Sequence, residues 1–148
     1  MLQPTTLTWL LLGFGWFILL VMLGAQGVMA VRPRSDPAKR LMIGKGEDWR
    51  DRTHFKSARG LSVADLALWL PLLLAGSIGV VLSQPWGYVL WASSGVVSVY
   101  VSILLWFLER EYVYPAVGPL AYYTYIWGMF VYWGVAVTAY SVARIVRL

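Results

Sequence analysis

Residues 7–31 read LTWLLLGFGWFILLVMLGAQGVMAV, a run without a charged side chain in which Gln26 is the only strongly polar residue. An α-helix needs about 20 apolar residues to cross a hydrocarbon core roughly 30 Å thick. No Lys or Arg precedes the run, which is much longer than the apolar core of about 7–15 residues in a secretion signal. The stretch therefore predicts a retained membrane-spanning helix.

Three further apolar runs follow, and each is continuously apolar rather than alternating, which favours helices over a barrel. The shortest contains Pro71 and can span a membrane only if its helix begins near Ser62, with Asp65 at the interface. Ser62 with an acid three residues later is typical of a helix N-terminus. Residues 83–86 predict a tight turn with Pro85 near the start of the next helix. The prediction is an all-α integral membrane protein, a single domain over 1–148 with an antiparallel bundle of four transmembrane helices at about 7–31, 62–82, 86–108 and 120–143.

The amino-acid composition agrees with a membrane environment. Hydrophobic residues make up 59% of the chain and charged residues 13%, whereas soluble domains have roughly 45–50% and about 25%. A soluble fold of this size lacks the interior to bury the excess. The chain has no cysteine, which excludes disulfides, thiolate metal sites and thiol chemistry.

Positive charge is concentrated in segment 32–60, which holds nine of the twelve Lys and Arg residues and four acids. With Arg110, ten basic residues fall on one side of the predicted spans, against Arg144 and Arg147 on the other. The positive-inside rule then predicts a cytoplasmic 32–60 loop with both termini on the opposite side, and a bacterial plasma membrane is the default location. Because apolar spans flank the loop, its basicity indicates membrane lipids as partners and not nucleic acid.

The 32–60 loop has two interpretations. Trp49 and Phe55 lie among charged residues, and Asp48 and Arg52 have the i,i+4 spacing of a helical ion pair, which favours a short helix on the headgroups. A solvated basic linker explains the composition equally well. In the first interpretation, the candidates for headgroup contact are Arg32, Arg34, Lys39, Arg40 and Lys45.

Ionisable side chains gather at the predicted cytoplasmic interface, where Asp65 opens one span and Glu109, Arg110 and Glu111 close the next. The ordinary explanation is a set of structural ion pairs, among themselves or with loop arginines such as Arg59. The sharper hypotheses are a socket for a headgroup or a partner, and an acid–base pair of a membrane enzyme. No acid lies near the middle of a span, so a proton-coupled pump is not expected.

The sequence offers no metal or cofactor motif. His54 is the only histidine, and it lies in the loop, so no span supplies an imidazole to a haem or a chlorophyll. No set of ligands has the spacing of a metal site. Neither a cofactor nor a metal is therefore predicted.

Span 86–108 carries Ser94, Ser98 and Ser102 at a spacing of four, a small-residue stripe that predicts close helix packing. Because Tyr132 and Ser98 fall at similar depth on neighbouring spans, a hydrogen bond between them is predicted. Aromatic residues crowd the second half of the chain, where 16 of the 23 lie between Trp86 and Tyr140. The candidates for partner or lipid contact are Trp91, Tyr122, Tyr123, Tyr125, Trp127, Tyr132 and Trp133.

Three functions are consistent with these features. The leading hypothesis is a non-catalytic accessory or structural subunit of a larger membrane protein complex, packed through spans 86–108 and 120–143. The second is binding or transport of a lipophilic small molecule, such as a quinone, a carotenoid or a lipid, in an aromatic-lined groove. The third is a membrane enzyme acting on a lipid headgroup at the cytoplasmic face through Asp65, Glu109 and Glu111. A cavity between the last two spans favours the second hypothesis.

Overall fold

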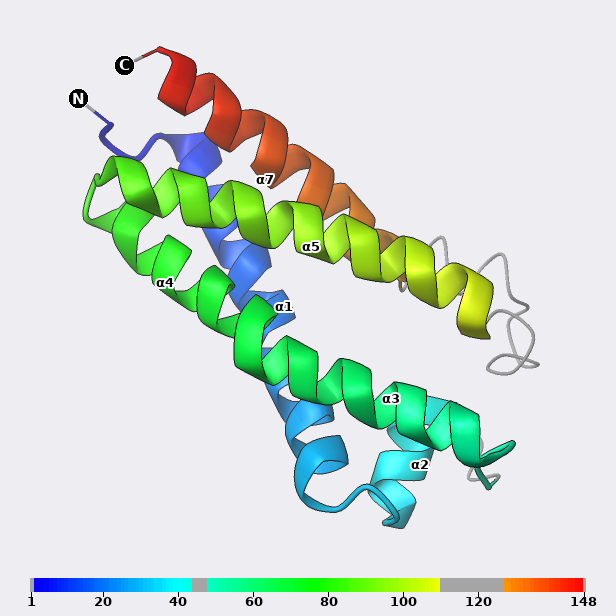
Figure 1. Cartoon of the computed structure of the whole chain (residues 1–148). Helices are drawn as coiled ribbons and strands as arrows, with labels where there is room; N and C mark the ends of the chain where they lie inside the picture. Colours follow the sequence, from blue (N-terminus) through cyan, green and yellow to red (C-terminus); the bar gives the residue numbers. More distant parts are fainter. Residues whose placement is uncertain (1, 44–47, 110–126, 148) are drawn as a thin grey trace.

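A computed structural model describes residues 2–43, 48–109 and 127–147. Within these ranges every regular element is helical (Figure 1). Both ends of the described chain lie at one end of the molecule, together with the turn between α4 (Leu70–Val81) and α5 (Pro85–Glu109), and α2 (Asp36–Ile43) lies at the other end (Figure 1). Four helical segments are long and apolar enough to cross a membrane, namely Thr6–Val31, Arg52–Val81, Pro85–Phe107 and Gly128–Val146.

Helix α1 (Thr6–Val31) forms over the first apolar run, as predicted. Thr5 caps its first turn, because the Thr5 hydroxyl accepts the backbone N–H of Thr8 and the Thr8 hydroxyl accepts the backbone N–H of Thr5. One side of α1 contributes to the core, whereas Leu10 and Leu20 on other sides are 67% and 63% exposed. In water such exposure is costly, but against lipid it is not.

The next segment is one long helical stretch made of α3 (Arg52–Ala64), a π-helical turn η1 (Asp65–Trp69) and α4 (Leu70–Val81). The predicted helix start near Ser62 is wrong, because Asp51 caps the helix by accepting the backbone N–H groups of Thr53 and His54 at 2.7 and 2.8 Å. Ser62 instead lies within the helix, one turn after Ala58, whose carbonyl accepts its hydroxyl.

The described parts of the 32–60 segment form helices and not a simple linker. Helix α2 (Asp36–Ile43) packs against the end of α1, and a small core of Met29, Ala38 and Ala58 joins α1, α2 and α3. The predicted pair of Asp48 with Arg52 is wrong, because Asp48 precedes the helix and its carboxylate lies 3.1 Å from the Lys39 ammonium.

The π-helical turn accommodates Pro71. A proline has no backbone N–H, and its ring collides with the carbonyl four residues earlier in a regular α-helix. Here the backbone N–H of Leu70 bonds to the carbonyl of Asp65, five residues back, so the widened turn lies immediately before Pro71. The chain therefore stays helical through this residue.

The chain turns sharply between α4 and α5 (Pro85–Glu109), and α5 packs along α4 (Figure 1). Ser83 adopts φ 59°, and Gln84 donates its backbone N–H to the carbonyl of Gly79, which together close a Schellman-type helix end. As predicted, Pro85 opens the next helix. The two helices touch through glycine, because a Cβ on Gly87 would lie 2.3 Å from the carbonyl carbon of Gly79.

Helix α7 (Gly128–Val146) packs along the other side of α5, and α1 contacts both α4 and α7. The first part of the predicted 120–143 span lies outside the described residues, and α7 continues to Val146. Three buried tryptophans join the helices through their indole N–H groups. The three indole donors and their acceptors are Trp69 with the Ser94 carbonyl, Trp91 with the Ser77 hydroxyl, and Trp133 with the Leu11 carbonyl, each at 3.0 Å.

Candidate functional site

A buried polar cluster joins α1 to the long second helix at Gln26, Ser62 and Asp65. The Gln26 side-chain amide donates to Asp65 Oδ2 at 2.8 Å, and its carbonyl oxygen accepts the Ser62 hydroxyl. Asp65 is 3% exposed, Gln26 6% and Ser62 0%. The Ser62 hydrogen is shared with the Ala58 carbonyl, 3.0 Å away. The cluster therefore joins α1 to the long second helix by hydrogen bonds within an otherwise apolar interface.

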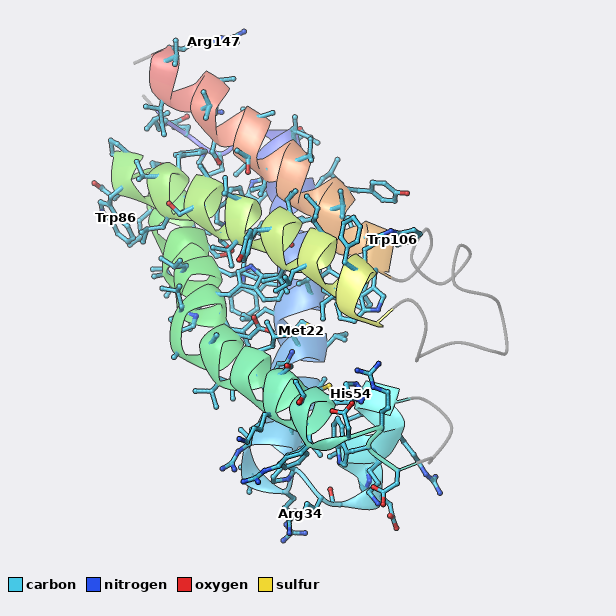
Figure 2. The ribbon with its side chains drawn as sticks, turned by 45° about the vertical axis from the view of Figure 1, so that its right-hand side comes forward. Met22, Arg34, His54, Trp86, Trp106 and Arg147 are labelled. Atoms are coloured by element: carbon cyan, nitrogen blue, oxygen red, sulfur yellow. The ribbon has the colours of Figure 1, made fainter. Side chains whose placement is uncertain are left out.

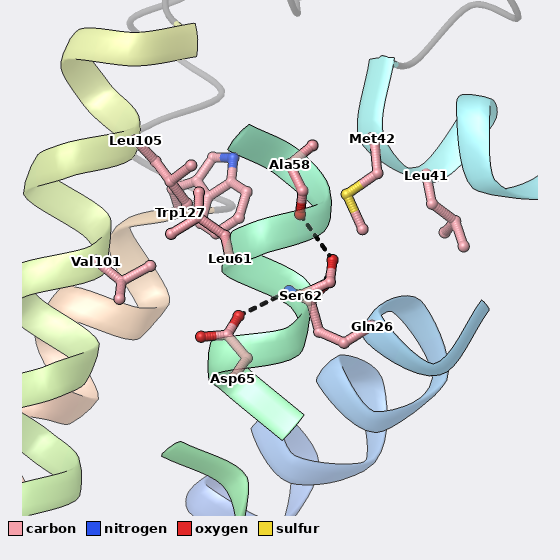
Figure 3. Close-up of a pocket in the computed structure, with 10 residues that line it drawn as sticks. All are labelled: Gln26, Leu41, Met42, Ala58, Leu61, Ser62, Asp65, Val101, Leu105 and Trp127. Atoms are coloured by element: carbon pink, nitrogen blue, oxygen red, sulfur yellow. Dashed lines mark hydrogen bonds between the residues drawn. The ribbon is translucent and has the colours of Figure 1, made fainter. Parts of the chain in front are cut away.

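A small cavity of about 30 Å³ lies against this cluster, closed on its other sides by Trp127 and by apolar side chains of α2, α3 and α5 (Figure 3). That volume is enough for about one or two water molecules. The second oxygen of Asp65 points away from Gln26, towards the side of α5 (Figure 3). The cavity can hold water beside the hydrogen-bonded Asp65 carboxyl group, but it is too small for a substrate.

The predicted interfacial group of Asp65 with Glu109, Arg110 and Glu111 cannot be assembled here, because Arg110, Glu111 and the Glu109 side chain lie outside the described residues. The predicted ion pair of Asp65 with a loop arginine is absent from the described part of the chain, where the hydrogen-bond donor to Asp65 is Gln26. Sequence reasoning missed Gln26 as a partner. The sequence does contain a signal for this contact, because Gln26 is the only strongly polar residue in the first apolar run.

The serine stripe of α5 is buried, with Ser94 0%, Ser98 1% and Ser102 6% exposed. The predicted bond between Tyr132 and Ser98 is replaced by another, because the Ser98 hydroxyl donates to the backbone carbonyl of Phe130 at 2.9 Å. The Tyr132 side chain is 57% exposed and points outward. The partner of Ser98 on α7 is therefore the Phe130 carbonyl and not the Tyr132 hydroxyl that was predicted.

The predicted aromatic contact residues divide into inner and outer positions. Trp91 and Trp133 are 0% exposed, so they belong to the core and cannot contact lipid or a partner as predicted. The Trp133 ring packs against Gly15, where an added Cβ would lie 3.0 Å from it. Trp127 lines the cavity beside Asp65. Tyr122, Tyr123 and Tyr125 lie outside the described residues.

The outer side of α5 and α7 is hollowed along its length. One groove of about 490 Å³ is lined almost wholly by apolar atoms of Val96, Val99, Tyr100, Ile103, Gly134, Val135, Thr138 and Ala139. A second hollow of about 320 Å³ continues from Ile103 and is lined by Trp106, Phe107 and Trp127 among others. The groove floor has no unpaired hydroxyl, because Thr138 donates to the Gly134 carbonyl at 2.7 Å. We call the first of these the α5–α7 groove.

The basic end around α2 and α3 differs from the apolar body. Figure 2 shows Arg34 and His54 there, far from Arg147 and Trp86. The Lys39 side chain donates a hydrogen bond to Asp48 and lowers the pKa of that carboxyl. The pKa of Asp51 is also lowered, mainly because the backbone N–H of His54 donates to the carboxylate. Lys45 lies outside the described residues.

At the opposite end, Arg144 joins the two ends of the chain. Its guanidinium donates to the Gln3 carbonyl at 2.7 Å and to the Tyr140 hydroxyl at 3.0 Å, and lies 5.3 Å from the centre of the Tyr88 ring. Tyr140 also shares hydrogen bonds with Thr5 and Thr8. Arg144 therefore has a structural role at this end of the molecule.

Among the residues that the structure describes, no three His, Cys, Asp or Glu side chains group as a metal site. Comparison of the chain with protein-family models, curated proteins and solved structures found no match.

Proposed function

We propose that the chain is an integral membrane protein with four spans, and that it serves as a non-catalytic subunit of a larger membrane protein complex. Each of the long helices leaves large apolar side chains exposed, such as Leu10 on α1 at 67% and Phe107 on α5 at 69%. Contiguous apolar surface of this extent is matched to lipid or to other membrane helices. The charge bias supports a cytoplasmic location for the α2 end, with both termini on the other side.

The observation that carries the subunit role is the α5–α7 groove, which is an open hollow on the surface and not the enclosed cavity between these spans that would favour a lipophilic ligand. Gly134, Thr138 and Ala139 give it a floor of small side chains, and the exposed Tyr100 and Ile103 form one wall. In membranes, small residues let helix backbones approach closely, so van der Waals packing drives association. An apolar transmembrane helix of a partner protein is the occupant that this floor fits, because the groove has no charged side chain and its surface is almost wholly apolar.

A second candidate function is the binding of a lipophilic small molecule in the adjoining hollow. The specific observation is that Trp106, Phe107 and Trp127 all line that hollow, of about 320 Å³. Flat ring systems stack on aromatic side chains. A quinone, a carotenoid or a lipid chain would suit such walls.

The test is extraction of the native protein in mild detergent, followed by separation and mass spectrometry of what migrates with it. Ala139→Trp fills the groove, and Ala136→Trp is the matched control, because Ala136 is exposed on α7 but does not line the groove. We expect a stoichiometric partner with the native chain and with Ala136→Trp, and its loss with Ala139→Trp. A photo-crosslinking residue at position 100 should also capture that partner, whereas one at position 20 on α1 should not.

The other outcomes separate the two candidates. A chain that migrates alone with a bound lipophilic molecule, lost on Trp106→Ala, supports the second function and rejects the first. A partner retained equally by Ala139→Trp and Ala136→Trp contradicts docking through the α5–α7 groove.

A further inference from the structure

A hollow of about 450 Å³ lies at the basic end, where α1 ends and α2 begins beside α3. It is lined by Arg32, Pro33, Arg34, Ser35, Phe55 and Arg59. The three arginines come from three places in the fold: the end of α1, the turn before α2 and the middle of α3. The Arg34 guanidinium stands 5.8 Å from the centre of the Phe55 ring, which helps to hold it over the hollow.

None of the described residues that line this hollow is acidic, although it shares Arg34 and Phe55 with a neighbouring hollow. The side-chain ion pairs found within the described residues are Lys39 with Asp48 and Arg50 with Asp51, and neither involves a residue lining the hollow. The neighbouring hollow beyond Arg34 differs, because Asp48 and Asp51 both line it. The Ser35 hydroxyl is engaged with the Arg32 carbonyl at 2.7 Å, which shapes the turn that presents the arginines.

Arginine is the side chain best suited to phosphate oxygens, because its planar guanidinium presents several N–H donors in a fixed fork. Three arginines that line one hollow, with no carboxylate among the lining residues, therefore favour a phosphate group. The apolar wall at Phe55 adds a surface for the non-polar part of the same molecule.

The depth of the hollow points to a lipid as the source of that phosphate. Arg32 is the first charged residue after the uncharged helix α1. Arg59 lies six residues before Asp65. It is therefore about 9 Å farther than Asp65 from the α4–α5 turn, measured along the helix. The length of helix between that turn and Arg59 exceeds the thickness of a hydrocarbon core, roughly 30 Å. Arg59 therefore lies at the level of the headgroups. Val63, one turn from Arg59 on the same face, is 52% exposed and available to an acyl chain.

We propose that Arg32, Arg34 and Arg59 bind the phosphate of an anionic phospholipid in the hollow beside Phe55. This site is independent of the α5–α7 groove, so either proposal can fail without the other. It also revises the headgroup contacts predicted from sequence: Lys39 is paired with Asp48, and Arg40 does not line the hollow.

The experiment uses the full chain, purified in detergent and stripped of lipid, with native mass spectrometry as the readout. The protein is titrated with phosphatidylglycerol, with phosphatidylcholine as the uncharged comparison, and with inorganic phosphate as the competitor. Two triple variants remove the same charge from the same end of the molecule. The hollow variant is Arg32→Gln/Arg34→Gln/Arg59→Gln, and the control is Arg40→Gln/Arg52→Gln/Lys56→Gln.

We expect phosphatidylglycerol to bind the native chain and the control more tightly than phosphatidylcholine. The hollow variant should lose at least about tenfold in affinity for phosphatidylglycerol, because it loses three charge contacts with the lipid. All three arginines are exposed, so the variant should keep its helical circular dichroism. If it does not fold, Arg34→Gln and Arg59→Gln are measured singly, and each should lose about threefold while the single control Arg40→Gln loses none.

Three results would overturn the proposal. An equal loss in the hollow variant and the control shows a diffuse charge effect and no site. Equal affinity of the native chain for the two lipids removes the role of the anionic headgroup. Displacement of phosphatidylglycerol by millimolar inorganic phosphate, with phosphate retained in the native spectrum, assigns the hollow to free phosphate and not to a lipid.

Discussion

The contact between Gln26 and Asp65 makes the sharpest prediction, because it is the polar link between α1 and the long second helix. Gln26→Leu keeps a side chain of similar size but removes the donor to Asp65. Ser62 keeps the Ala58 carbonyl at 3.0 Å, so it is not left without a partner. The expected cost is therefore that of one buried acceptor without a donor, about 2 kcal/mol. For a chain of this size, that loss lowers the midpoint of thermal unfolding by about 4–8 °C.

The assay is thermal unfolding in mild detergent, followed by circular dichroism, for the native chain and four variants. Gln26→Leu and Asp65→Leu should each destabilise the protein. The double variant should be more stable than the sum of the two effects implies, with a coupling of about 1–3 kcal/mol, because no polar group is left without a partner. Asp65→Asn should stay near the native value, because an amide oxygen still accepts from Gln26.

The matched control is Gln84→Leu. Gln84 is exposed, and its side chain makes only a long contact of 3.4 Å with the Leu82 carbonyl in the described structure. It should change the midpoint little. Native-like stability of Gln26→Leu, or strict additivity in the double variant, would refute the reasoning that this hydrogen bond holds the two helices together.

Three further predictions test other parts of the fold. Gly87→Ala should destabilise by about 1–3 kcal/mol in thermal unfolding, because its Cβ would meet the backbone of Gly79, whereas Gly24→Ala, with nothing within 4 Å, should be neutral or stabilising. Asp51 has a lowered pKa in the folded chain, so it contributes stability above its unfolded pKa of about 3.9 that disappears as the pH falls through the folded value. In a pH series of unfolding midpoints, Asp51→Asn should lose this acid dependence, and an unchanged acid limb would contradict the capping role. Trp133→Phe should cost about 1–3 kcal/mol in urea or thermal unfolding, because it removes the indole that donates to a backbone carbonyl of α1 at 3.0 Å, and an unaffected midpoint would contradict that link.

The helical class and the positions of the apolar segments could be predicted because they depend on local quantities. The continuous apolar run at 7–31 predicts a helix whatever it packs against, since the length and the polarity of the run are sufficient. The turn at Pro85 could be predicted for the same reason, because proline is well suited to the first position of a helix. The concentration of basic residues near α2 is likewise visible in the sequence.

Helix boundaries at the basic end could not be read reliably, because two residues there can each cap a helix. Asp51 and Ser62 are both favourable N-cap residues, and the choice depends on which side chain has another partner. Ser62 faces Gln26 across a helix contact, so its hydroxyl is engaged with α1. The ion pair of Asp51 with the adjacent Arg50 uses Oδ2 and leaves Oδ1 to cap α3.

The partners of the polar and aromatic side chains depend on how the helices rotate against one another. Along the chain, Trp91, Tyr132 and Trp133 look alike as aromatic residues in apolar spans, yet two are buried and one faces outward. A rotation of α7 by a fraction of a turn would exchange the positions of Tyr132 and Trp133. That rotation is set by the close contact of Gly95 with Gly134, which joins residues from separate helices. Local sequence determines that these helices form, whereas long-range contacts of this kind determine which side of each one faces the core.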